Sequence, residues 1–169
     1  MEINKIDLNS HIRSGSLIIL GVIICTNFSR ILSFLYPNQG SENDYWIGLI
    51  VFILLVLPAI IIHINYYLVN RGDVLEYSFE RKEVTITHKQ ISISFYLNDI
   101  DFVEQSISFN KAANRSSVLP WDGYNHSVIH LKNGDLFTVT SLLVPDLNLP
   151  IEKEKVKIKR NVYRLAKIR

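Results

Sequence analysis

The chain has 169 residues, 48% of them hydrophobic, and its 18 Lys and Arg nearly balance 16 Asp and Glu. Nucleic-acid-binding proteins usually carry a concentrated basic face, and a net charge of +2 is too small to indicate one, so we expect no nucleic-acid partner. Cys25 is the single cysteine, which excludes an intramolecular disulfide and a thiolate metal cluster. The mean hydropathy of +0.16 comes mostly from residues before Val69, which divides the chain into an apolar part and a water-soluble part.

Two apolar segments, residues 17–36 and 46–68, dominate the first part. Each is long enough to provide the roughly 20 helical residues that cross a bilayer. Pro58 is expected to kink the second helix without ending it, because neighbouring groups can satisfy the freed carbonyl. In the first segment Arg30 lies in the distal third, where we expect it to snorkel to the interface, and Thr26 and Asn27 are expected to bond across to the second helix. Residues 17–69 are therefore predicted to form a transmembrane helical hairpin.

The polar stretch 37–44 contains no Lys or Arg and is predicted to be the turn between the helices. Cations lie instead on the outer flanks, with Lys5 and Arg13 before the first helix and Arg71 after the second. The positive-inside rule then places both termini in the cytoplasm, with residues 1–16 as an N-terminal tail. A cleaved signal peptide is the alternative for the first segment, but the apolar run has no convincing small-residue cleavage site.

From residue 73 onward the apolar period changes to two, which predicts antiparallel strands with one buried face. Asn133 and Gly134 are typical of a tight hairpin turn that needs positive φ at both central positions. Residues 106–117 have no period and are predicted to form a long mobile loop. At least six strands are predicted, and they are centred on Val74 to Phe79, Val84 to Ile86, Ile91 to Phe95, Ile100 to Val103, Val128 to Leu131 and Phe137 to Ser141.

The last segment, 153–169, is compatible with two structures. Val156 and Ile158 alternate with lysines as in a strand, whereas Ile158, Val162 and Leu165 recur at helical spacing. We favour a helix, because the helical pattern covers more of the segment.

Residues 97–101 read LNDID at the start of a strand, and residues 130–135 read HLKNGD across the predicted hairpin. With these motifs, residues 73–169 resemble the bacterial pleckstrin-homology-like domains that follow paired membrane helices. The resemblance implies an α+β fold in which an antiparallel sheet or partly open barrel is closed by a C-terminal helix. It also implies anchoring in the bacterial cytoplasmic membrane. The long loop before Trp121 departs from the family pattern, so no ligand residues are carried over.

Candidate chemical groups are few. His126 and His130 lie about 13 Å apart if they are in one strand, so they cannot share a metal ion, and Asp99 and Asp101 are interpreted as solvated charges on a sheet. His63 lies near the cytoplasmic end of the second helix, where we expect neutral packing at the interface. We therefore predict no catalytic residue, no metal site and no cofactor.

Two surfaces remain as candidate contacts. Trp121 and Tyr124 either plug the sheet or contact a protein partner, since aromatic residues are common at interface centres. Lys155, Lys159 and Arg160 belong to a group of eight cations in residues 153–169 that either solvate a surface or bind anionic lipid.

These observations predict a membrane-anchored, non-enzymatic module that binds a protein partner or the membrane surface. The alternative is an auxiliary or regulatory subunit of a transporter or envelope complex, in which Thr26, Asn27 and Arg30 would make helix contacts.

Overall fold

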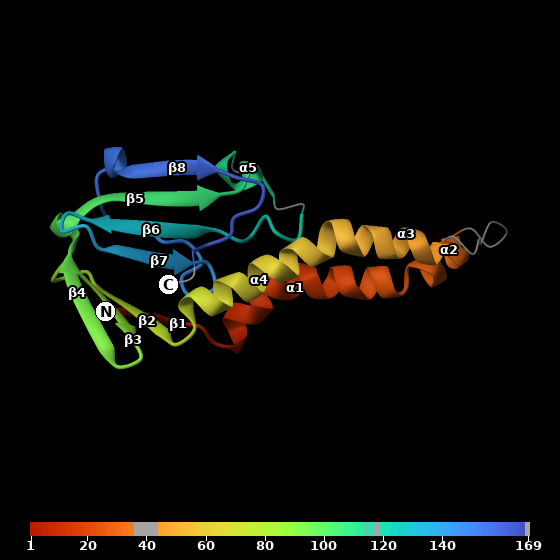
Figure 1. Ribbon diagram of the computed structural model, residues 1–169, viewed down its shortest axis with the longest axis horizontal. Coiled ribbons are helices and arrows are strands. Elements are labelled where there is room, and N and C mark those ends of the chain that lie inside the picture. Colours follow the sequence, from red (N-terminus) through yellow and green to blue (C-terminus); the bar gives the residue numbers. More distant parts are fainter. Residues whose placement is uncertain (36–43, 114, 117–118, 168–169) are drawn as a thin grey trace.

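Two four-stranded sheets form one end of the molecule, and a helical hairpin projects from them (Figure 1). The computed structural model describes residues 1–35, 44–113, 115–116 and 119–167. The prediction of an antiparallel α+β fold is confirmed at this level. The predicted turn at 37–44 lies outside the described residues, except for Asp44.

The first sheet has the order β1-β2-β3-β4, and its neighbouring strands are antiparallel. Its central strands alternate buried and less buried residues, as a sheet with one covered face requires. Residues 1–16 were predicted to be an N-terminal tail, but part of this segment forms the outermost strand β1, which pairs with β2. The strands are β1 (Glu2–Lys5), β2 (Asp73–Ser78), β3 (Glu83–His88) and β4 (Ile91–Tyr96).

The second sheet has the order β7-β6-β5-β8. Pairing is antiparallel except between β5 and β8, which are parallel. The strands are β5 (Ile100–Ile107), β6 (His126–Leu131), β7 (Leu136–Thr140) and β8 (Val156–Arg160). A 3-10 turn at Leu97–Asp99 joins the two sheets, and another at Lys153–Lys155 precedes β8.

An apolar core, which we call the sheet core, fills the space between the sheets. Residues after β7 contribute to it as well as the strands themselves. Its buried members are Leu75, Tyr77, Val84, Ile86, Phe95, Leu97, Ile100, Val103, Ile129, Leu131, Phe137, Val139, Leu143, Val144 and Leu147.

The prediction of a C-terminal helix is wrong. Within the described part of 153–169, residues 156–160 form β8, and the two-residue alternation of Val156 and Ile158 with lysines was the correct signal. The helical pattern failed because Val162 and Leu165 are exposed, whereas Arg164 between them is buried.

The predicted long loop at 106–117 is also shorter than expected. Strand β5 continues to Ile107, and the Ser108 side chain caps a short helix, α5 (Phe109–Ala112), by accepting a hydrogen bond from the Lys111 amide.

The hairpin between β6 and β7 is confirmed, but its turn differs from the prediction. The Gly134 amide donates to the Leu131 carbonyl at 2.9 Å, and only Gly134, at φ +93°, has positive φ in this turn. The Leu131 amide also donates to the Asp135 carbonyl at 2.9 Å, so the connection is a three-residue hairpin loop that ends in a glycine of positive φ. The two-residue turn with positive φ at both positions lies instead between β3 and β4, at Lys89 and Gln90.

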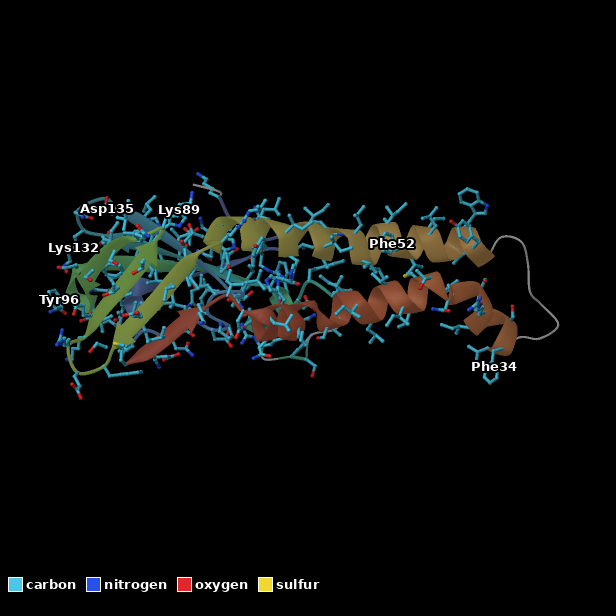
Figure 2. All side chains as sticks on the ribbon, turned by 90° about the horizontal axis from the view of Figure 1, so that it is seen from below. Phe34, Phe52, Lys89, Tyr96, Lys132 and Asp135 are labelled. Carbon is cyan, nitrogen blue, oxygen red and sulfur yellow. The ribbon has the colours of Figure 1, made fainter. Side chains whose placement is uncertain are left out.

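The helical hairpin is formed by two long helical segments. The first comprises α1 (Leu8–Thr26) and α2 (Phe28–Leu35), and the second comprises α3 (Asp44–Val51), a π-helical turn (Phe52–Val56) and α4 (Leu57–Asn70). Figure 2 shows Phe34 near the far end of the hairpin, whereas Lys89, Tyr96, Lys132 and Asp135 lie at the opposite end of the molecule.

Pro58 is accommodated without ending the second helix, as predicted. It stands at the beginning of α4, directly after the π-helical turn, in which the Leu57 amide donates to the Phe52 carbonyl. The wider turn absorbs the irregularity that a missing amide donor creates.

Close approach of the two segments depends on glycine. A Cβ atom on Gly21 would come within 2.9 Å of Val56 Cγ2, and one on Gly48 within 3.0 Å of Phe28 Cβ. Thr26 and Asn27 were expected to bond across to the second helix, but their side chains donate to carbonyls of their own helix, at Val22 and Ile23.

Candidate functional site

The base of the hairpin enters the sheet domain and forms a second core. Ala59, Ile62, Tyr66 and Val69 lie on one face of α4, at spacings of three and four residues, and all are buried. They pack against Trp121, Tyr124, Leu142 and Ala166, which come from the segments after α5 and β7 and from the C-terminal region. We call these eight residues the junction core.

A chain of hydrogen bonds runs through the junction from α1 to the sheet domain. His11 Nδ1 lies 3.0 Å from His63 Nε2, and His63 Nδ1 lies 2.7 Å from the Tyr124 hydroxyl. Each ring nitrogen donates or accepts according to the tautomer, so the three side chains adopt mutually dependent proton positions. The chain thus joins both hairpin helices to one residue of the domain.

A second polar contact lies beside the first. The Tyr66 hydroxyl is 3.1 Å from His126 Nδ1, and the Tyr66 ring meets the edge of the Tyr124 ring at a centroid distance of 5.6 Å. Burial raises the pKa of the Tyr124 phenol, which is therefore neutral at pH 7. Burial and, secondarily, the Arg164 charge lower the pKa of His126, which favours its neutral form.

Arg164 is the most deeply buried cation of the junction, with 1% of its surface exposed. Its guanidinium donates to backbone carbonyls of Tyr124 at 2.7 Å and of Asn161 at 2.6 Å, and also to the carbonyls of Val162 and Trp121. A buried charge is stable only when its donors are satisfied. Arg164 therefore joins the C-terminal segment to the loop that carries both aromatic residues.

Two asparagines of α4 complete the attachment. Asn65 forms a reciprocal pair with the backbone of Ala166, donating to its carbonyl at 3.0 Å and accepting from its amide at 2.8 Å. Asn70 likewise donates to the Thr138 carbonyl and accepts from the Thr140 amide, both at 2.8 Å. These bonds fix α4 to β7 and to the C-terminal segment, so the hairpin has a defined orientation relative to the sheets.

The structure brings Trp121 and Tyr124 together in this junction. They are 5% and 0% exposed, and the helix they contact belongs to the same chain. Of the two interpretations given for them, plugging the sheet or contacting a protein partner, their burial fits the packing one.

Lys155, Lys159 and Arg160 lie elsewhere, on the 3-10 turn before β8 and on β8 itself. Lys159 Nζ is 2.8 Å from Glu104 Oε2, and Lys155 Nζ is 4.0 Å from Glu152 Oε2. Arg160 is exposed at the end of the strand. None of these three side chains takes part in the junction contacts described above.

The histidines of β6 have different environments. His126 belongs to the junction, whereas His130 stacks on Phe102 with a centroid distance of 3.9 Å. Asp99 accepts a hydrogen bond from the Tyr96 amide at 2.9 Å, and Asp101 is exposed. Within the described ranges, no group of three or more His, Cys, Asp or Glu could hold a metal ion.

Sequence reasoning missed His11, Tyr66 and Arg164 as parts of one site. Arg164 was counted among the eight C-terminal cations expected either to solvate a surface or to bind anionic lipid, and its burial fits neither role. A usable signal was present only for Tyr66, because it shares a helical face with Ile62 and Val69 and carries a hydroxyl that needs a buried partner.

A family model described as "PH domain" matches residues 5–151, a range that includes the helical hairpin as well as most of both sheets. No curated protein and no solved structure matches the chain significantly.

Proposed function

Because the chain belongs to the PH domain family, whose members are generally non-catalytic binding modules, we propose that it is a membrane-anchored, non-enzymatic module that binds a protein partner or the membrane surface. The hairpin is the anchor, and the two sheets form the binding domain on the cytoplasmic side of a bacterial inner membrane.

The exposed apolar surface of the hairpin carries this proposal. Two helices, Leu8–Thr26 and Tyr45–Asn70, are long and apolar enough to cross a membrane, but only 11% and 22% of their apolar windows are buried. A core helix of a soluble protein would hide most of such a surface. From Leu17 to the end of α2 the first segment is about 28 Å long at 1.5 Å per residue, close to the thickness of a bilayer core.

The position of α1 also argues against a cleaved signal peptide. Strand β1 precedes α1 and pairs with β2, and Asp7 caps the helix by accepting a 2.8 Å hydrogen bond from the Ser10 amide. Removal of α1 would separate β1 from the sheet. Arg13 and Arg71 flank the hairpin on the domain side, which supports a cytoplasmic domain by the positive-inside rule.

Membrane extraction and sided labelling test this proposal. The full chain should stay in the membrane pellet after carbonate washing and dissolve in detergent. In a Cys25→Ala background, Ser41→Cys should react with an impermeant maleimide added to intact cells, whereas Lys132→Cys should react only after permeabilisation. Release by carbonate would refute the anchor, and the reverse labelling pattern would refute the orientation.

An auxiliary subunit of a transporter or envelope complex is the second candidate. It relied on polar contacts from the first helix, but Thr26 and Asn27 are hydrogen-bonded within their own helix, which leaves exposed Arg30 as the group available to a partner. Loss of a crosslinked membrane partner on Arg30→Gln, with Lys89→Gln unchanged, would favour this candidate.

A further inference from the structure

A recess of about 240 Å³ lies where α1 leaves the sheet domain. One wall is the α1 segment around Ser14 and Ser16, and the other comes from α5 and the loops after α5 and β7. Figure 1 shows α5 at the end of the domain from which the hairpin projects. The recess is lined by Arg13, Ser14, Ser16, Leu17, Lys111, Pro120, Gly123, Ser141, Pro145 and Asp146.

Two cations from different elements face this recess. Arg13 of α1 is exposed and donates one long hydrogen bond, at 3.4 Å, to the Ser141 carbonyl. A guanidinium has five N–H donors, so most of its donor capacity is available to a ligand. Lys111 of α5 forms an ion pair with Asp146, which is itself 57% exposed. The recess therefore carries two positive charges and one negative charge.

Hydroxyl groups and an apolar edge complete the lining. The side chains of Ser14 and Ser16 have no hydrogen bond to any described residue, and Ser16 is exposed. Leu17 is 38% exposed and is continuous with the apolar surface of the hairpin toward its tip. One boundary of the recess is thus polar and cationic, and the adjacent boundary is apolar.

We propose that this recess binds the phosphate group of an anionic phospholipid, with its acyl chains lying along the hairpin beyond Leu17. The inference rests on the proposed membrane anchoring, which places the apolar run in the hydrocarbon core and the recess at the headgroup level. Arg13 is the main phosphate contact, because guanidinium groups pair with phosphate oxygens in a bidentate manner. Lys111 adds a second charge, and Asp146 limits the affinity.

The acyl chains distinguish this ligand from a soluble phosphate. A free phosphate would use only the cations and hydroxyls, whereas a lipid also covers the exposed apolar surface from Leu17 toward the tip of the hairpin. The net charge of the recess selects an anionic lipid over a zwitterionic one, whose phosphate is accompanied by its own cation.

Lipid titration of the full chain in neutral detergent, followed by native mass spectrometry, tests the proposal. The probes are phosphatidylglycerol, phosphatidylcholine and inorganic phosphate. Arg13→Gln and Lys111→Gln should each weaken phosphatidylglycerol binding about fivefold, the equivalent of about 1 kcal/mol per cation. Asp146→Asn should strengthen binding, which a general loss of structure cannot imitate. Lys89→Gln, in the turn between β3 and β4 and outside the lining of the recess, should have no effect.

Unchanged phosphatidylglycerol binding in both cation variants would overturn the proposal, as would equal binding of phosphatidylcholine by the wild type. Loss of binding only on replacing Lys155, Lys159 and Arg160 together would assign the lipid to β8 instead. Displacement of the lipid by low millimolar phosphate would refute the lipid assignment. Carbonate extraction of the same variants separates this outcome from a failure of membrane anchoring, because a variant can lose the lipid and remain in the membrane pellet.

Discussion

The sheet core relies on apolar packing, whereas the junction combines an apolar core with buried polar groups. Between the sheets the buried cluster consists of apolar residues, including Leu75, Val84 and Ile129. At the junction, buried Tyr66 and Tyr124 lie beside Arg164, and all three use polar atoms in specific contacts. Apolar packing is non-directional, whereas hydrogen bonds fix angles as well as distances. The junction is therefore suited to hold two parts of the molecule in one orientation.

Among the variants considered, replacement of Arg164 in the junction should lower the stability of the protein most. Arg164→Met preserves much of the volume but leaves several backbone carbonyls of the junction unsatisfied. We expect a loss of about 3 to 5 kcal/mol in the free energy of unfolding, or roughly 10 °C in melting temperature, for the full chain in neutral detergent. Arg160→Met is the matched control, because Arg160 is exposed, and should change stability by less than about 0.5 kcal/mol. Equal melting temperatures for the two variants would contradict the role assigned to Arg164.

Acid should destabilise the junction through His126. Burial and the nearby Arg164 lower its pKa in the folded protein below the reference value of 6.5, while Glu104 opposes them. Below about pH 6.5 the unfolded chain binds a proton that the folded chain resists, so stability falls with falling pH until the lower folded pKa is reached. The slope from this group is at most about 1.4 kcal/mol per pH unit.

The measurement compares denaturant unfolding at pH 5 and pH 7. His126→Gln should show a smaller loss at pH 5 than the wild type, and His130→Gln should retain the wild-type loss. A His126→Gln variant with an unchanged pH dependence would show that another group titrates.

The smallest effect is expected in the first sheet, at the turn between β3 and β4. Lys89 and Gln90 have φ values of 45° and 74°, a conformation that side chains with Cβ atoms disfavour. Replacing them by Asn and Gly, the preferred residues of this turn, should stabilise the full chain by about 1 kcal/mol. The gain should leave the pH dependence unchanged, since the junction is not altered. A lower melting temperature would show that the side chains of Lys89 or Gln90 make contacts that outweigh the strain.

The contrast between apolar packing in the sheets and specific polar contacts in the junction also explains which features could be predicted from the sequence. Period-two alternation in β2, β3 and β6 identifies strands because each has one buried face, and the predicted strands are all present. Strand β1 was missed because it has only four residues, of which Ile3 alone is apolar. Strand β8 was predicted as part of a helix because Ile158 belongs to two patterns, the two-residue alternation with Val156 and the helical spacing with Val162 and Leu165.

The junction could not be predicted in the same way. Asn65 meets Ala166 across 101 positions of sequence, and His11 meets His63 across 52. No local pattern encodes such pairs. Trp121 and Tyr124 were identified as candidate contact residues from the sequence. Only the structure shows that the surface they contact is helix α4 of the same chain.

The pairing of β1 with β2 has a consequence for biogenesis. The whole helical hairpin lies between these two neighbouring strands in the chain, so Glu2–Lys5 leave the ribosome long before Asp73–Ser78 are made. During that interval β1 has no strand to pair with, and the first sheet closes only after both helices have been synthesised. Completion of the first sheet therefore waits for synthesis of the whole hairpin, so under the proposed anchoring both helices are available to the bilayer before the domain can close.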